Sequence, residues 1–134
     1  MIMSVGNLVS MEKFKKLPEN ISVFPSVDQM AVLQKADVFI SHCGMNSVNE
    51  SLYFGVPLVM LPQTSEQKGV ATRVAQLGAG VKLEKTDAVS ILNAVNNVLV
   101  DNSYRQNAAT IAKGFQRCSG AKGAADKIMS VCKK

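Results

Sequence analysis

The chain has 134 residues, of which 47% are hydrophobic and 19% are charged. This length fits one domain with an ordinary core, and the apolar content excludes a disordered chain. The longest apolar stretch, residues 55–61, is much shorter than a membrane-spanning helix, and the first residues lack the pattern of a secretory signal. Three scattered cysteines do not make a disulfide framework and favour a reducing compartment. We therefore expect a cytoplasmic protein.

The net charge of +5 raises the question of a nucleic-acid partner. The chain has only seven aromatic residues (two Tyr, five Phe, no Trp), and its basic residues are not interleaved with aromatic ones that would stack on bases. We therefore expect no nucleic-acid partner. The lysines near the end of the chain indicate a solvated helical face, and their functional use would be to attract small phosphorylated ligands.

The first part of the chain predicts two short strands and two short helical segments. Residues 2–5 and 21–24 are apolar runs of strand length, and residues 11–17 have room for one or two helical turns. Asp28 precedes a further short helical pattern as a capping residue.

Strands and helices alternate through the middle of the chain. The predicted elements are a strand over 37–41, a helix over 46–54, a buried strand over 57–61, a helix over 65–77 and a strand over 79–83. Gly55 and Gly78 follow the two helices as C-cap signals. Three helical patterns complete the chain, and Asp87 caps the first of them. This order predicts an α/β, Rossmann-like parallel sheet flanked by helices on both faces.

Polar clusters follow three of the predicted strands, at residues 26–29, 42–47 and 63–67. In an open parallel sheet, ligands bind at the carboxyl ends of the strands. The three clusters are therefore expected at the functional edge of the sheet.

The cluster at 42–47 combines a strand end, a glycine turn and a helix start. Free N–H groups and the helix dipole attract an anion at such a place, and Gly44 allows close backbone approach. His42, the only histidine, together with Asn46 and Ser47 adds polar groups that suit a phosphate or diphosphate. Glu50, one turn further on, suits the adjacent hydroxyls of a sugar.

A purely structural interpretation of the same residues stays open. Ser47 and Glu50 have the spacing of a capping box, in which both side chains satisfy backbone donors. A single histidine is also often a hydrogen-bonded structural residue.

Three motifs carry a resemblance to a known family: His-Cys-Gly-Met-Asn-Ser-x-x-Glu-Ser at 42–51, Gly-Val-Pro at 55–57 and Pro-Gln-x-x-Glu-Gln at 62–67. Together they resemble the donor-sugar signature of the UDP-glycosyltransferase superfamily, and they are most similar to its bacterial macrolide glycosyltransferase-like branch. The similarity extends over about residues 2–128.

The resemblance implies a GT-B architecture, in which an N-terminal domain binds the acceptor and a C-terminal domain binds the nucleotide-sugar. Residues 1–134 would form a single nucleotide-sugar-binding domain, the C-terminal half of such an enzyme without its first strand and helix. The acceptor domain would lie elsewhere in the same polypeptide or on a partner subunit. The open sheet edge of such a truncated domain leads us to expect self-association.

The resemblance also implies roles for the residues around the second strand–helix junction. His42 and the backbone of Gly44 would contact the diphosphate, while Asn46 and Ser47 would hold the phosphate nearer the nucleoside. Glu50 would bind the ribose hydroxyls.

The remaining implied contacts lie in the other two clusters. Glu66 and Gln67 would bind hydroxyls of the transferred sugar, Gln29 would lie near base and ribose, and Val27 would present its backbone to the base. Ser26 stands where the family has a base-stacking tryptophan, which weakens the expected nucleotide affinity and leaves UDP- and dTDP-sugars as alternative donors.

The expected activity is inverting transfer of a hexose to a small, lipophilic acceptor. The general base is expected on the absent acceptor domain, so no catalytic residue is assigned to this chain, and neither a metal nor another cofactor is expected. Cys43 is expected to be buried rather than nucleophilic. Two alternatives stay open, namely a stand-alone subunit of a split glycosyltransferase and a non-catalytic nucleotide-binding module.

Overall fold

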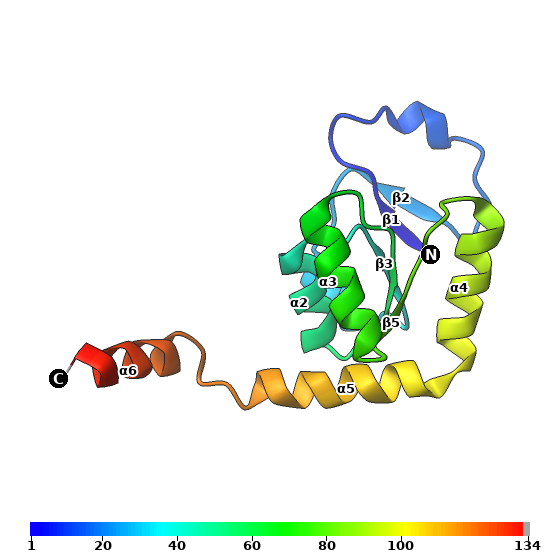
Figure 1. Ribbon diagram of the computed structural model, residues 1–134. Coiled ribbons are helices and arrows are strands. Elements are labelled where there is room, and N and C mark those ends of the chain that lie inside the picture. The colour runs from blue at the N-terminus through cyan, green and yellow to red at the C-terminus, as the bar shows by residue number, and fades with distance from the viewer. Residues whose placement is uncertain (133–134) are drawn as a thin grey trace. The chain divides into compact units, whose positions relative to one another are not determined.

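The computed structural model describes residues 1–132. The chain divides into two compact units, residues 1–35 and residues 36–134 (Figure 1). The expectation of one nucleotide-sugar-binding domain over residues 1–134 stays a prediction.

The first unit contains a parallel pair of short strands, β1 (Ile2–Ser4) and β2 (Ser22–Phe24). Met3 lies opposite Val23 in the register of this pair. The helix α1 (Gln29–Leu33) follows, and the Asp28 side chain accepts a hydrogen bond from the Ala31 N–H at 3.1 Å. Both strands and the cap at Asp28 are as predicted.

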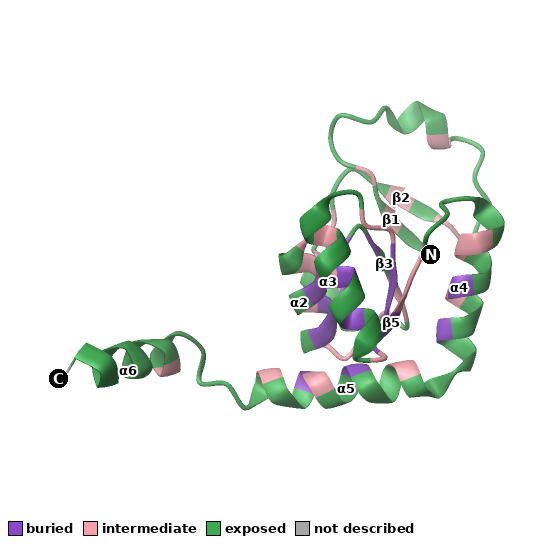
Figure 2. Ribbon diagram, viewed as in Figure 1, coloured by how far each residue is buried: buried purple, intermediate pink, exposed green. Residues whose placement is uncertain are grey.

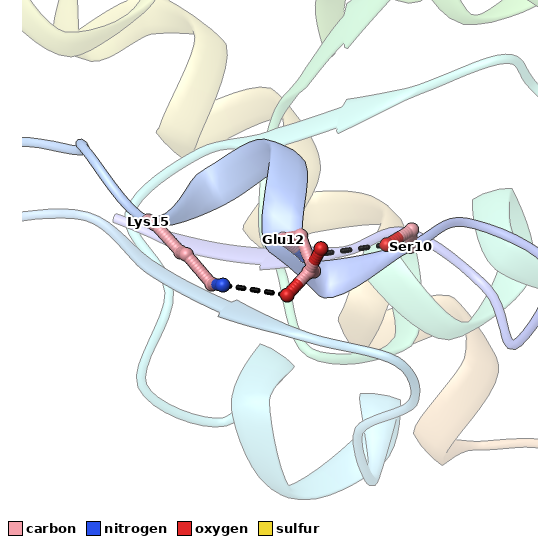
Figure 3. Close-up of polar contacts among 3 residues, drawn as sticks. All are labelled: Ser10, Glu12 and Lys15. Atoms are coloured by element: carbon pink, nitrogen blue, oxygen red, sulfur yellow. Dashed lines mark hydrogen bonds and ion pairs between the residues drawn. The ribbon is translucent and has the colours of Figure 1, made fainter.

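The connection between β1 and β2 contains the 3-10 helix η1 (Met11–Phe14), whose polar contacts are drawn in Figure 3. Ser10 Oγ accepts a hydrogen bond from the Glu12 N–H at 3.4 Å, and Lys15 Nζ lies 2.5 Å from Glu12 Oε1. Both side chains of this ion pair are mostly exposed. Exposed pairs contribute only about 0–1 kcal/mol, so these contacts hold the segment weakly.

The second unit is built on a three-stranded parallel sheet with strand order β3-β4-β5. Its strands are β3 (Phe39–Ser41), β4 (Leu58–Met60) and β5 (Gly80–Lys82). Its helices are α2 (Met45–Tyr53), α3 (Ser65–Gln76), α4 (Ala88–Val100), α5 (Asn102–Gln116) and α6 (Gly120–Cys132). The predicted alternation is confirmed, with strand and helix ends that differ by one or two residues.

The alternating side chains of the central strand β4 reach two cores. Leu58 and Met60 belong to a cluster with buried residues of α2, α3 and α5, whereas Val59 belongs to a cluster with Ala94 and Val98 of α4. All three residues of β4 are fully buried. The sheet is therefore covered on both faces, as Figure 2 shows for the buried residues of the strands and of the helix faces toward them. The predicted Rossmann-like α/β class is confirmed.

Two glycines end helices as predicted, because both adopt the left-handed conformation. Gly55 after α2 has φ +68° and Gly78 after α3 has φ +65°. Within residues 1–132, no helix is both long enough and apolar enough to cross a membrane.

Candidate functional site

The junction between β3 and α2 is the centre of the predicted site. β3 ends at Ser41, and α2 begins at Met45 with Gly44 as its N-cap residue. No side chain caps this helix start. The Gly44 carbonyl accepts the first helical hydrogen bond, from the Val48 N–H at 3.1 Å. In helices generally, the first amides are not bonded to carbonyls of the same helix, and their partial positive charge suits an anion at such a place.

Other helices of the protein begin differently. The N-termini of α1, α3, α4 and α5 are each capped by a side chain, which comes from Asp28, Thr64, Asp87 and Asp101 in turn. An uncapped start with glycine before it is therefore a particular feature of α2 among these five helices.

His42 lies over the start of α2. A Cβ atom built on Gly44 would stand only 2.9 Å from His42 Nε2, so the imidazole occupies the space beside the missing side chain. His42 itself is exposed. The imidazole therefore lies beside Gly44, the N-cap residue of α2, and its contact with a diphosphate stays a prediction.

Cys43 has an unusual backbone conformation in the loop between β3 and α2. It has φ +69°, the left-handed conformation that few residues other than glycine adopt. Its N–H donates to Ser41 Oγ at 3.2 Å, and Ser41 is itself buried. A residue held in this region costs about 1–3 kcal/mol, which the surrounding packing must offset.

The Cys43 side chain is fully buried, as predicted. Burial raises the pKa of its thiol to about 11, because the thiolate would lose its hydration. The thiol therefore stays protonated at neutral pH and is a poor nucleophile.

The capping-box interpretation of Ser47 and Glu50 is wrong. The helix begins at Met45 with Gly44 as N-cap, so Ser47 lies inside the first turn and is not the capping residue. The Ser-x-x-Glu spacing also occurs inside helices, where it carries no capping geometry. Ser47 and Glu50 are both half-buried on α2, and Asn46 is exposed.

The loop after β4 lies at the same end of the sheet. Ser41 is paired with Met60 in the parallel register, and the Leu61 N–H donates to the Ser41 carbonyl at 2.9 Å. The two predicted clusters 42–47 and 63–67 therefore follow neighbouring strands at their carboxyl ends, as expected for one site.

Gln67 has a structural role that the sequence analysis missed. Its Oε1 accepts hydrogen bonds from the N–H groups of Gln63 (2.8 Å) and Thr64 (3.2 Å), and the Gln67 N–H donates to Thr64 Oγ1. This is a capping box at the start of α3. Its signal, Thr-x-x-Gln, is present in the sequence. The adjacent Glu66 is exposed in the first turn of the same helix.

Val27 and Gln29 belong to the first unit. Val27 is half-buried between β2 and α1, and Gln29 is the first residue of α1. Ser26 is exposed, and so is Phe24 at the end of β2. Phe24 is the aromatic residue nearest in sequence to the serine.

A metal centre would need several ligating side chains around one point. Among residues 1–132, no group of three or more His, Cys, Asp and Glu side chains is placed to hold a metal ion. The expectation that the chemistry needs neither a metal nor another cofactor stays a prediction.

The model of one protein family matches residues 9–116; its description is "UDP-glucoronosyl and UDP-glucosyl transferase". Among curated proteins, NDP-glycosyltransferase YjiC of Bacillus subtilis is 42% identical over 135 aligned residues, which cover 99% of this chain and 34% of that protein. The chain thus spans about a third of the relative's length.

Solved structures show the same similarity in three dimensions. The glycotransferase of kitacinnamycin superposes with a TM-score of 0.88 at 30% identity, over 96% of this chain and 34% of that one. Os79 from O. sativa, solved in complex with UDP, superposes with a TM-score of 0.81 at 25% identity, over 98% of this chain and 33% of that one. The expected similarity to GT-B glycosyltransferases is thereby confirmed for the third of their length that this chain covers.

Proposed function

The chain belongs to the UDP-glucoronosyl and UDP-glucosyl transferase family, and from this premise we propose that it binds the nucleotide-sugar donor of an inverting glycosyltransferase. The donor in this proposal is a UDP- or dTDP-sugar whose hexose is transferred to a small, lipophilic acceptor. The acceptor-binding part lies outside these 134 residues, in the same polypeptide or on a partner subunit. The cytoplasm remains the proposed location.

The β3–α2 junction is the single observation that carries this proposal. It places His42 beside the uncapped start of α2, at the end of the sheet where the loop after β4 also lies. A diphosphate at this position would accept hydrogen bonds from the imidazole, from the amides near Gly44 and from the Asn46 and Ser47 side chains. The dipole of α2 adds to this attraction.

The other proposed contacts come from the resemblance to the family's donor site, and each is assigned to one part of the donor molecule. Glu50, half-buried on α2, binds the ribose hydroxyls. Glu66 and the amide group of Gln67 bind the transferred sugar. Val27 and Gln29 bind the base and ribose.

The chemistry proposed for this chain is stabilisation of the leaving group. The acceptor oxygen, deprotonated by a base outside the chain, forms a bond to the anomeric carbon as the bond from that carbon to the diphosphate breaks. Negative charge then develops on the diphosphate. Donors already aimed at that position stabilise the charge without reorganisation. In this mechanism His42 donates to phosphate and removes no proton from the acceptor.

Isothermal titration calorimetry with UDP, dTDP and UDP-glucose tests the proposal. We expect binding that His42→Ala weakens about 10- to 100-fold, because a hydrogen bond to a charged group contributes about 1.5–3 kcal/mol. Asn49→Ala is the matched control, since Asn49 is an exposed residue of α2 with no proposed contact. No binding at millimolar UDP, or equal binding by His42→Ala, would overturn the proposal.

A second candidate is a nucleotide-binding module without catalysis, and the observation that favours it is Ser26. This exposed serine offers no aromatic face to a base, and base–aromatic stacking contributes about 1–3 kcal/mol. A module of this kind predicts UDP binding without any glycosyl transfer when an acceptor-binding part is supplied in trans. A stand-alone subunit of a split enzyme predicts transfer in the same assay.

A further inference from the structure

Ser41 is a buried polar residue at a place in β3 that faces the core. Only 7% of this residue is exposed. Side chains two positions apart in a strand point to the same face, and Phe39 packs against the cluster of α2, α3 and α5 residues that also contains Cys43. A hydroxyl buried beside such a cluster lowers stability unless it is hydrogen-bonded. The partner of the Ser41 hydroxyl therefore indicates what this side chain does.

That partner is the backbone amide of Cys43. Its N–H donates to Ser41 Oγ at 3.2 Å, and no backbone carbonyl within residues 1–132 accepts from the same amide. A serine that accepts from the amide two residues further on forms a local turn, which competes with the extended backbone of a strand. Cys43 has left this extended conformation, with φ +69°. The hydroxyl therefore stabilises the strained backbone conformation of Cys43.

Ser41 is itself held in place by the sheet. It lies opposite Met60 in the register of β3 and β4, and its carbonyl accepts from the Leu61 N–H at 2.9 Å. The central strand β4 is buried along its whole length. The hydroxyl is thus a fixed point at the end of the strand, from which residues 42–44 lead to α2.

We infer that Ser41 is a positioning residue of the donor site, whose hydroxyl keeps the His42 imidazole beside Gly44 by holding Cys43 in the left-handed conformation. Cys43 stands between the two residues, so its backbone angles set where the imidazole lies relative to Gly44. Packing of the thiol holds the Cys43 side chain but supplies no acceptor for its amide. The inference rests on the proposed function, and Ser41 itself touches no donor in it.

Calorimetry with UDP measures the effect of the hydroxyl on donor binding. Ser41→Ala should weaken binding about tenfold, the lower end of the loss expected for His42→Ala, because the imidazole stays on the protein but is no longer held in position. Ser41→Thr keeps the hydroxyl and should bind UDP as the unaltered chain does. Circular dichroism checks that each variant is folded.

Ser51→Ala is the matched control. Ser51 is also a buried serine, and its hydroxyl donates to the Val56 carbonyl at 2.8 Å, toward the other end of α2. Its loss should lower stability without lowering UDP affinity, which separates positioning from general destabilisation. A double variant, Ser41→Ala with His42→Ala, should bind no more weakly than His42→Ala alone, because residues that act through one another have non-additive effects.

Nuclear magnetic resonance of the free chain tests the same inference without a ligand. In Ser41→Ala the Cys43 amide hydrogen should exchange with solvent faster, and the imidazole signals of His42, the only histidine, should shift. Ser51→Ala should leave the His42 signals unchanged.

The outcomes separate this inference from the proposed function. If the unaltered chain does not bind UDP, the proposed function fails, and the spectra alone decide whether Ser41 positions His42. Imidazole signals that Ser41→Ala leaves in place overturn the inference in either case. With UDP binding established, it is also overturned by unchanged affinity in Ser41→Ala, by an equal loss in Ser51→Ala or Ser41→Thr, or by additive losses in the double variant.

Discussion

His42 and Gly44 form a pair in which the absence of one side chain makes room for the other. The Nε2 atom of His42 lies 2.9 Å from the position that a Cβ atom on residue 44 would take. Gly44 has φ −58°, which any residue can adopt, so its requirement is for space and not for backbone freedom. The position of the imidazole at the start of α2 therefore depends on glycine at residue 44.

Gly44→Ala is expected to reduce UDP affinity about tenfold while leaving the fold intact. The added methyl group meets the end of a side chain that can rotate away, so the free energy of unfolding should change by less than about 1 kcal/mol. The displaced imidazole, however, can no longer donate to the diphosphate. Calorimetry with UDP and urea denaturation measure the two effects.

Gly69→Ala on α3 is the control for this prediction. A Cβ atom there meets no atom within 4 Å. In a helix the change should stabilise the protein by about 0.5–1 kcal/mol and leave UDP affinity unchanged. Full UDP affinity in Gly44→Ala would show that His42 does not act from its observed position.

Gln67→Glu should separate the structural role of this residue from its proposed contact with the sugar. A carboxylate retains the acceptor that caps α3 and is favoured at a helix N-terminus, so stability should be preserved. The substitution removes the amide donors. We expect unchanged affinity for UDP and a several-fold loss of affinity for UDP-glucose, both measured by calorimetry.

Two further variants complete the Gln67 experiment. Gln76→Glu makes the same chemical change at an exposed residue at the other end of α3 and should leave both affinities unchanged. Gln67→Ala removes the cap as well and should lower the free energy of unfolding by about 1 kcal/mol. Unaltered UDP-glucose binding by Gln67→Glu would remove Gln67 from the proposed sugar site.

Much of the fold follows from local signals in the sequence. Asp28 and Asp87 cap helices as predicted, and Gly55 and Gly78 end helices in the left-handed conformation. These features depend on a few neighbouring residues, so sequence spacing is sufficient to find them. The parallel sheet follows from the alternation of strands and helices.

The details of the candidate site depend on where each helix begins, which spacing alone does not determine. Ser47-x-x-Glu50 and Thr64-x-x-Gln67 have the same capping pattern, but only the second stands at a helix start. The left-handed backbone conformation of Cys43 could not be predicted from the sequence either, because cysteine is not a residue type that favours this conformation. The conformation depends on the hydrogen bond from the Cys43 N–H to Ser41 Oγ and on the packing of the thiol in the core, and both are known only from the structure.

The buried thiol of Cys43 is expected to make stability depend on alkaline pH. Its pKa is raised from the ordinary value of 9.0 to about 11 by burial. Between these values the unfolded chain releases the thiol proton while the folded chain retains it. The free energy of unfolding should therefore fall as pH rises through this range, by a total on the order of 2 kcal/mol.

Urea denaturation at about pH 8, 9.5 and 11 measures how the free energy of unfolding depends on pH. The same measurements on Cys43→Ala give the comparison. The variant is less stable at every pH but should lack the Cys43 part of the alkaline slope. Cys118 and Cys132 are exposed and remain in both proteins, so they do not contribute to the difference. Equal slopes in the two proteins would contradict a raised thiol pKa.

Gly80→Ala is expected to be the most destabilising of these substitutions, because the added methyl group would collide with backbone atoms and not with a movable side chain. A Cβ atom on residue 80 would lie 2.4 Å from the Leu58 carbonyl oxygen and 3.1 Å from the Leu58 nitrogen. Gly80 and Leu58 are directly paired in the β4–β5 ladder, so neither chain can move without disturbing the register. We expect a loss of about 3 kcal/mol or more in the free energy of unfolding, measured by urea denaturation. Gly114→Ala, where a Cβ atom on α5 meets nothing within 4 Å, should stabilise the chain slightly, and a Gly80→Ala protein as stable as this control would show that β5 does not lie this close to β4.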